Sequence, residues 1–122
     1  MAVTARNQRV AEEMKKEVAR IIRDEVKDPR LEAGLVSVTG VELSNDRHYA
    51  KVYVSIYGDD EVKNQAMEGL TRATSFIRRE IGQRLSLRYT PEITFKIDAS
   101  IEHGDHINRL LARVRAGEQP DE

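Results

Sequence analysis

The sequence predicts a mixed α+β fold in which helices cover one face of a small three-stranded sheet. Two observations lead to this prediction: apolar residues recur at helical spacing in two long segments, and they alternate with polar residues in three short ones. A chain of 122 residues has room for one domain with one modest core. We therefore expect a single domain over residues 1–116, followed by a short polar tail over residues 117–122.

The composition excludes several classes of protein. Hydrophobic residues make up 39% of the chain and charged residues 34%, a balance typical of globular proteins and not of disordered or membrane ones. No apolar run approaches the roughly 20 residues of a membrane span, and residues 1–9 lack the apolar stretch of a secretory signal. The chain has no cysteine, which excludes disulfides and thiolate zinc sites. We expect a cytoplasmic protein.

The first expected element is an amphipathic helix. Its apolar residues recur at helical spacing, while lysines and arginines occupy the other faces. Asp28-Pro29 ends this helix, because the residue before a proline is disfavoured in helical angles. The apolar face consists of Val10, Met14, Val18, Ile21, Ile22 and Val26.

Two strands follow, and we expect them to pair antiparallel. In the valine-rich segment 35–43 the inward-facing set changes phase at Gly40, which predicts a β-bulge there. Turn residues at positions 44–46 lead into the second strand. There the inward residues Ala50, Val52, Val54 and Ile56 alternate with the outward residues Lys51, Tyr53, Ser55 and Tyr57.

Helical spacing returns from Asp60 to about Leu87. In its middle stands Ala73-Thr74-Ser75, and small polar residues whose hydroxyls compete for backbone hydrogen bonds commonly mark a kink. We therefore predict two helices that meet near residue 74. After Thr90-Pro91 a third strand is expected at residues 93–97, and a short helix beyond Gly104.

This order of elements (α-β-β-α-kink-α-β plus a short C-terminal helix) matches the bacterial, type II version of the KH domain, an RNA-binding module. In an ordinary KH domain a Gly-X-X-Gly loop between the paired helices clamps about four backbone nucleotides. Here that loop is absent, and Ala73-Thr74-Ser75 occupies its place. The sequence therefore predicts a KH-like domain without the usual loop.

Charge is distributed unevenly along the chain. The formal net charge of −1 is unlike that of most nucleic-acid binders. Between Arg72 and Arg88, however, five arginines face the single acid Glu80, while acids gather at residues 59–61 and in the tail. Such a distribution suits binding of a polyanion through one face. The alternative is that the arginines only solvate a helix. The five are Arg72, Arg78, Arg79, Arg84 and Arg88.

The predicted kink offers a place for a phosphate. If the second helix begins at Thr74 or Ser75, its hydroxyl can cap the first turn, where free N–H groups attract an anion. A polar stripe of Arg72, Ser75, Arg79 and Gln83 follows at helical spacing. We expect Phe76 and Tyr89 to pack rather than to stack on bases, and Lys51, Tyr53 and Lys96 to form a solvent-facing side of the sheet.

Four stretches, taken in order, resemble the ribosome-binding factor A family. They are Arg9-Val10, Lys27-Asp28-Pro29-Arg30-Leu31, residues 50–55 and residues 91–95, and the positions of Asp98, Ser100 and Gly104 also fit. The likeness runs from about residue 6 to residue 114, and this chain departs from it in a brief extension after Arg115.

The resemblance implies a helix-kink-helix built around Ala73, whose basic face meets small-subunit ribosomal RNA. It implies binding to free 30S subunits and 16S rRNA, a role in late subunit maturation and in processing the 5′ end of 16S rRNA, and importance for growth in the cold. We expect a monomer that is released by a ribosome-dependent GTPase. The expected RNA-binding residues are Lys27, Arg30, Arg72, Ala73, Thr74, Ser75, Arg78, Arg79, Gln83, Arg84 and Arg88.

Two other classes of function compete with this one. The best candidate for an enzymatic site, Glu102-His103-Gly104-Asp105-His106, lacks the spacing of a His-Glu-X-X-His zinc site, and no phosphate loop is present. We therefore expect neither catalysis nor a metal or cofactor. A general KH-like RNA-binding module, or a protein-interaction module using the first helix, stays open.

Overall fold

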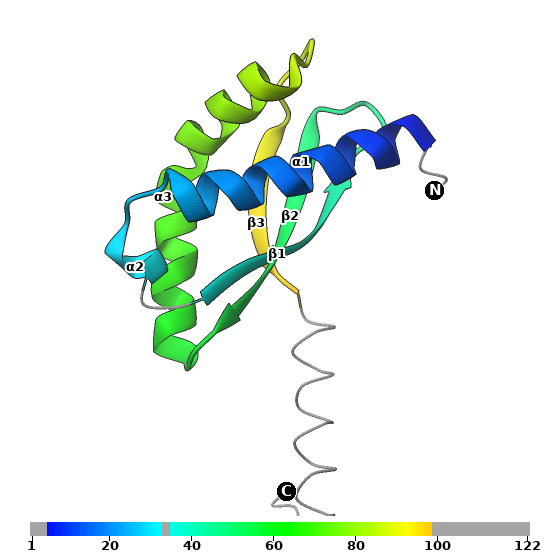
Figure 1. The fold of residues 1–122 in the computed structure, drawn as a ribbon. Coiled ribbons are helices and arrows are strands. Elements are labelled where there is room, and N and C mark those ends of the chain that lie inside the picture. Colours follow the sequence, from blue (N-terminus) through cyan, green and yellow to red (C-terminus); the bar gives the residue numbers. More distant parts are fainter. Residues whose placement is uncertain (1–4, 33–34, 99–122) are drawn as a thin grey trace, which may run out of the picture.

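The computed structural model of the protein describes residues 5–32 and 35–98. Within them the elements follow in the order α1 (Ala5–Asp24), α2 (Pro29–Glu32), β1 (Leu35–Leu43), β2 (Tyr49–Tyr57), α3 (Asp60–Leu85) and β3 (Glu92–Ile97). Figure 1 shows α1 crossing in front of the strands. The helix expected beyond Gly104, the histidine segment 102–106 and the tail 117–122 lie outside the described residues.

The sheet has the strand order β1-β2-β3, with β2 in the centre. β1 and β2 pair antiparallel, as predicted, with Val38 opposite Val54 and Gly40 opposite Tyr53. The register skips Thr39, which confirms the bulge predicted beside Gly40. β3 runs parallel to β2, a relation that requires a long crossover connection, which α3 supplies.

One face of the sheet meets the helices and forms the core. β2 alternates between buried and more exposed residues, so its buried side chains all point to that face. α1 and α3 bury their apolar faces against the same side chains, which confirms the predicted layer arrangement. The centre of this core consists of Met14, Val18, Ile21, Val52, Val54, Leu70, Ile77 and Ile81.

The segment between α1 and β1 contains a short helix that the sequence did not predict. α1 ends at Asp24, earlier than expected. Pro29 is the first residue of α2, a position that suits proline because a backbone N–H there would have no partner within the helix. The Asp28 carboxylate accepts a hydrogen bond of 2.9 Å from the backbone N–H of Arg30. A Cβ at Gly69 would lie 3.3 Å from the Cβ of Arg30, so the glycine lets α2 dock closely on α3.

α3 is one continuous helix, so the prediction of two helices meeting near residue 74 was wrong. Thr74 Oγ1 donates to the carbonyl of Leu70 at 2.9 Å, and Thr71 Oγ1 donates to the carbonyl of Met67 at 2.9 Å. A hydroxyl bonded to the carbonyl four residues back can bend a helix without interrupting its backbone hydrogen bonds. Figure 1 shows that the green and yellow-green halves of α3 point in different directions.

Both ends of α3 are fixed locally. Asp59 caps the first turn by accepting a hydrogen bond of 2.9 Å from the backbone N–H of Val62. After Leu85 the chain reverses at Ser86, whose φ of 49° is left-handed, and Pro91 is then fully buried. The segment 86–91 therefore returns along α3 and carries Arg88, Tyr89 and Thr90 beside it.

Candidate nucleic-acid interface

Two surface depressions lie on neighbouring sides of α3. The larger one, of about 530 Å³, is called the arginine pocket and is lined by Ser75, Arg78, Arg79, Arg88, Tyr89 and Thr90. The smaller one, of about 250 Å³, is called the Ala73 pocket and is lined by Glu25, Val26, Lys27, Asp28, Arg72, Ala73 and Phe76. Seven of the predicted RNA-binding residues thus line these two depressions.

Arg78 holds the returning segment against α3. Its Nε donates to the carbonyl of Pro91 at 3.1 Å, and one terminal nitrogen donates to the carbonyl of Thr90 at 2.9 Å. The guanidinium therefore closes one side of the arginine pocket while two of its donors are used within the protein. Its positive charge still contributes to the pocket.

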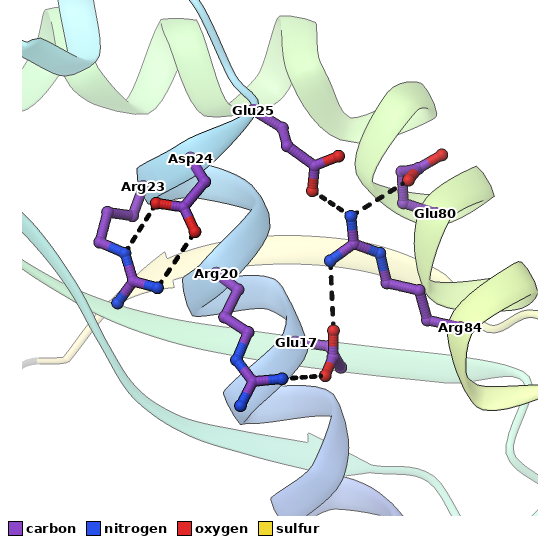
Figure 2. A network of polar contacts seen from close by, with 7 residues as sticks. All are labelled: Glu17, Arg20, Arg23, Asp24, Glu25, Glu80 and Arg84. Atoms are coloured by element: carbon purple, nitrogen blue, oxygen red, sulfur yellow. Dashed lines mark hydrogen bonds and ion pairs between the residues drawn. The ribbon is translucent and has the colours of Figure 1, made fainter.

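Arg84 is occupied by three carboxylates, as Figure 2 shows. It reaches Glu17 on α1 at 3.2 Å, Glu80 one turn back on α3 at 3.3 Å, and Glu25 just after α1. Burial lowers the pKa of Arg84, but the hydrogen bonds that it donates to Glu17 and Glu25 outweigh this and hold the pKa above its usual value. The side chain thus joins α1 to α3. The sequence alone could not show whether Arg84 forms such ion pairs or contacts a phosphate.

Four of the predicted RNA-binding cations line the two pockets and remain available to a ligand. Arg79 and Arg88 are exposed and make no hydrogen bond or ion pair within residues 5–32 and 35–98, and the same holds for Lys27. Arg72 is 3.4 Å from Glu68, but both side chains are more than half exposed, so this pair is readily exchanged for a phosphate.

Some of the other predicted site residues are exposed on the surface, and the rest form contacts within the protein. Ser75 is exposed in the arginine pocket, and Gln83 is exposed one turn beyond Arg79. Thr74 is bonded inside the helix, so its hydroxyl does not cap a helix, and the expected phosphate site at a helix start near residues 74–75 was wrong. Arg30 lies 3.7 Å from Asp28 and so pins the turn before α2.

Tyr89, which was predicted to pack rather than to stack on bases, has a largely exposed side chain. Its side chain is 63% exposed, and Phe76 in the Ala73 pocket is 38% exposed. The Tyr89 ring meets the ring of His48 edge to face, with centroids 5.7 Å apart and planes at 64°. A signal was present in the sequence, because Tyr89 follows Arg88 directly and precedes the helix-breaking pair Thr90-Pro91.

The opposite face of the sheet is polar. Lys51 and Lys96 are exposed, as predicted. Tyr53 donates a hydrogen bond of 3.1 Å to Glu42 Oε2, and this bond, together with burial and the nearby charge of Glu42, raises the pKa of Tyr53. This face therefore carries both signs of charge, unlike the arginine pocket.

The arrangement on α3 suits anion binding. Within the described part of the chain no three His, Asp or Glu side chains gather in a way that could hold a metal ion. In the same residues no helix is both long and apolar enough to cross a membrane. The geometry provides a surface with cations, small side chains and an exposed aromatic ring.

Comparison with known proteins places the chain in a family. Residues 6–111 match the family model described as ribosome-binding factor A. A protein named ribosome-binding factor A from Moorella thermoacetica is 93% identical over 122 residues, which cover the whole of both chains.

Solved structures with this fold carry the same name. The crystal structure of ribosome-binding factor A from Thermus thermophilus superimposes with a TM-score of 0.64 at 28% identity, covering 73% of this chain and 92% of that one. A homology model of the Thermus thermophilus factor, fitted into the cryo-EM map of its complex with the 30S subunit, gives a TM-score of 0.61 at 28% identity, covering 74% of this chain and 92% of that one. The chain therefore belongs to the ribosome-binding factor A family and has its KH-like α+β fold.

Proposed function

We propose that this protein is an assembly factor of the small ribosomal subunit. It binds free 30S subunits and their 16S rRNA, promotes late maturation and 5′-end processing of that rRNA, and matters most for growth at low temperature. The RNA-binding domain comprises residues 1–116 and acts as a cytoplasmic monomer without a cofactor.

The observation that carries this proposal is the arginine pocket. Arg79 and Arg88 are exposed there without partners among the described residues, and none of the acids Glu17, Glu25 and Glu80, which Arg84 engages, lines this pocket. Arg84 offsets part of the negative charge of these acids, which weakens their repulsion of phosphates. A net charge of −1 is compatible with RNA binding because the cations gather on one face.

Support also comes from the related Thermus thermophilus factor, whose coordinates were fitted into the map of a 30S complex. We propose that this protein binds the small subunit with the face of α3 that carries both pockets. The small side chains of Ala73 and Ser75 then admit an RNA backbone close to the helix, and Arg72, Arg79, Arg88 and Lys27 contact its phosphates. We propose that a ribosome-dependent GTPase releases the protein, and this enzyme would be a separate partner because the sequence has no phosphate loop of its own.

Cosedimentation through sucrose gradients tests the binding step. The protein should travel with free 30S subunits and not with mRNA-bearing polysomes. Charge reversal at Arg79 and Arg88 should abolish this, while reversal of Arg20, which pairs with Glu17 on α1, should not. Association with mRNA in place of 30S subunits would instead support the general RNA-binding module.

A deletion strain tests the maturation step. It should accumulate 16S rRNA with unprocessed 5′ ends and an excess of free 30S subunits, more strongly in the cold. Mapping of 5′ ends by primer extension at two temperatures measures this directly. Mature ends and normal subunit ratios in the cold would contradict the proposed role.

A further inference from the structure

The ring of Tyr89 stands at the boundary between two depressions of different chemistry. Beside the arginine pocket lies a depression of about 260 Å³, here called the His48 pocket, which is lined by His48, Tyr49, Arg78, Tyr89, Thr90 and Glu92. Arg78, Tyr89 and Thr90 line both, so they form the wall between them.

The two sides of this wall suit different parts of a nucleotide. The arginine pocket offers Arg79 and Arg88, which attract a phosphate. The His48 pocket offers the aromatic side chain of Tyr49, 59% exposed, and the carboxylate of Glu92, which repels a phosphate but can accept hydrogen bonds from a base. The phosphate of an RNA nucleotide therefore fits the arginine pocket, and its base fits the side of the His48 pocket.

The wall is held in place before any ligand arrives. Arg78 donates hydrogen bonds to the carbonyls of Thr90 and Pro91, and Pro91 is buried. His48 supports the Tyr89 ring edge to face. This contact restrains the ring, so it loses less conformational entropy on binding than a side chain without a neighbour would.

We infer that Tyr89 is the stacking platform of a subsite for one unpaired RNA nucleotide, whose base lies on the ring while its phosphate is held by Arg79 and Arg88. In an A-form duplex each base is covered by its neighbours and offers no free face, so only a splayed or single-stranded base can use this ring. The inference rests on the proposed function and adds the kind of nucleotide that the site takes.

The chain contains no tryptophan and RNA has no indole, so a single introduced tryptophan can report stacking on protein-free RNA without background. In the Tyr89→Trp variant, titration with protein-free 16S rRNA should quench the indole emission, because a stacked base quenches a neighbouring indole. The matched control is Tyr57→Trp: Tyr57 is 80% exposed at the far end of β2 and lines neither pocket. Its emission should stay nearly constant in the same titration.

Affinity for 30S subunits gives a second readout. Tyr89→Leu should weaken binding by roughly 5- to 150-fold, the usual effect of removing one base–aromatic stack. Tyr89→Phe should bind within about twofold of the original chain, since it keeps the ring.

The outcomes separate the inference from the proposed function. If the original chain binds 30S subunits but the Tyr89→Trp emission is unquenched and Tyr89→Leu binds normally, the subsite is overturned while the proposed function stands. Quenching in Tyr89→Trp together with the loss in Tyr89→Leu supports the subsite. If the original chain fails to bind 30S subunits at all, both fail.

Discussion

Gly82 on α3 lies directly against Thr90 of the returning segment: a Cβ at position 82 would be 2.4 Å from Thr90 Oγ1 and 3.5 Å from Thr90 Cβ and Cγ2. A side chain at position 82 would therefore push Thr90 away or force it into another rotamer. The small size of Gly82 thus lets the segment that carries Tyr89 lie close to α3.

The first prediction concerns this contact. Gly82→Ala should lower the free energy of unfolding by about 1 kcal/mol, because an overpacking cost of about 1–3 kcal/mol exceeds the gain in helix propensity of about 1 kcal/mol. It should also weaken 30S binding by displacing Tyr89. Gly40→Ala is the control, since a Cβ there meets nothing within 4 Å. Urea denaturation and cosedimentation measure both effects, and unchanged binding by Gly82→Ala would contradict this role for the contact.

The second prediction concerns Ala73, which is half-buried and lines the Ala73 pocket. Ala73→Leu should keep the fold, at a cost of at most about 1–3 kcal/mol, but fill the pocket and obstruct the RNA backbone. Ala11→Leu, a comparable half-buried change on α1, should show a similar cost and normal 30S binding. Circular dichroism melts and cosedimentation of both variants test this. Normal binding by Ala73→Leu would show that the backbone does not approach here.

The third prediction separates the roles of two arginines on α3. Arg84→Met should lower the melting temperature at low salt by a few degrees, because it leaves Glu17, Glu25 and Glu80 facing one another. The difference should shrink at high salt, which screens their repulsion. Arg79→Met should leave the melting temperature unchanged, because Arg79 has no partner among the described residues, yet weaken 30S binding. The interpretation fails if both variants melt alike.

The fourth prediction concerns salt. Each phosphate neutralised by the protein contributes about −0.7 to −0.9 to the slope of log K against log salt concentration. Arg79→Gln should therefore reduce the steepness for 30S binding by about that amount. Arg20→Gln, which removes a charge already paired with Glu17, should leave the slope unchanged. Titration of binding over a series of salt concentrations measures the slope, and a flat dependence for the original chain would rule out phosphate contacts as the main source of affinity.

The sequence predicted those parts of the fold that depend on local pattern. The alternation in β2 and the change of phase at Gly40 fixed which side chains face the core, so the antiparallel pair and its bulge followed. The parallel placement of β3 was not predicted, because an isolated strand pattern carries no direction. The short α2 was missed because four residues leave no periodic signal.

The site was predicted in composition but not in arrangement. Small polar residues near position 74 correctly marked a change of direction in α3, but their hydroxyls bond within the helix, so no new helix starts there. Arg84 finds partners on α1, far away in the sequence, which a charge count along α3 cannot show. The exposure of Tyr89 depends on the reversal at Ser86 and on the hold of Arg78, both tertiary features.

The parallel pairing of β3 with the central strand also bears on when the protein becomes active during its own synthesis. A chain emerging from the ribosome exposes the free edge of β2 until residues 92–97 are available, and pairings between distant segments form late. Because Arg78 holds the carbonyls of Thr90 and Pro91, which lead into β3, the ring that we propose as a stacking platform reaches its place when this strand joins the sheet. A chain that lacks residues 92–97 therefore lacks the parallel strand pairing on which the placement of this ring depends.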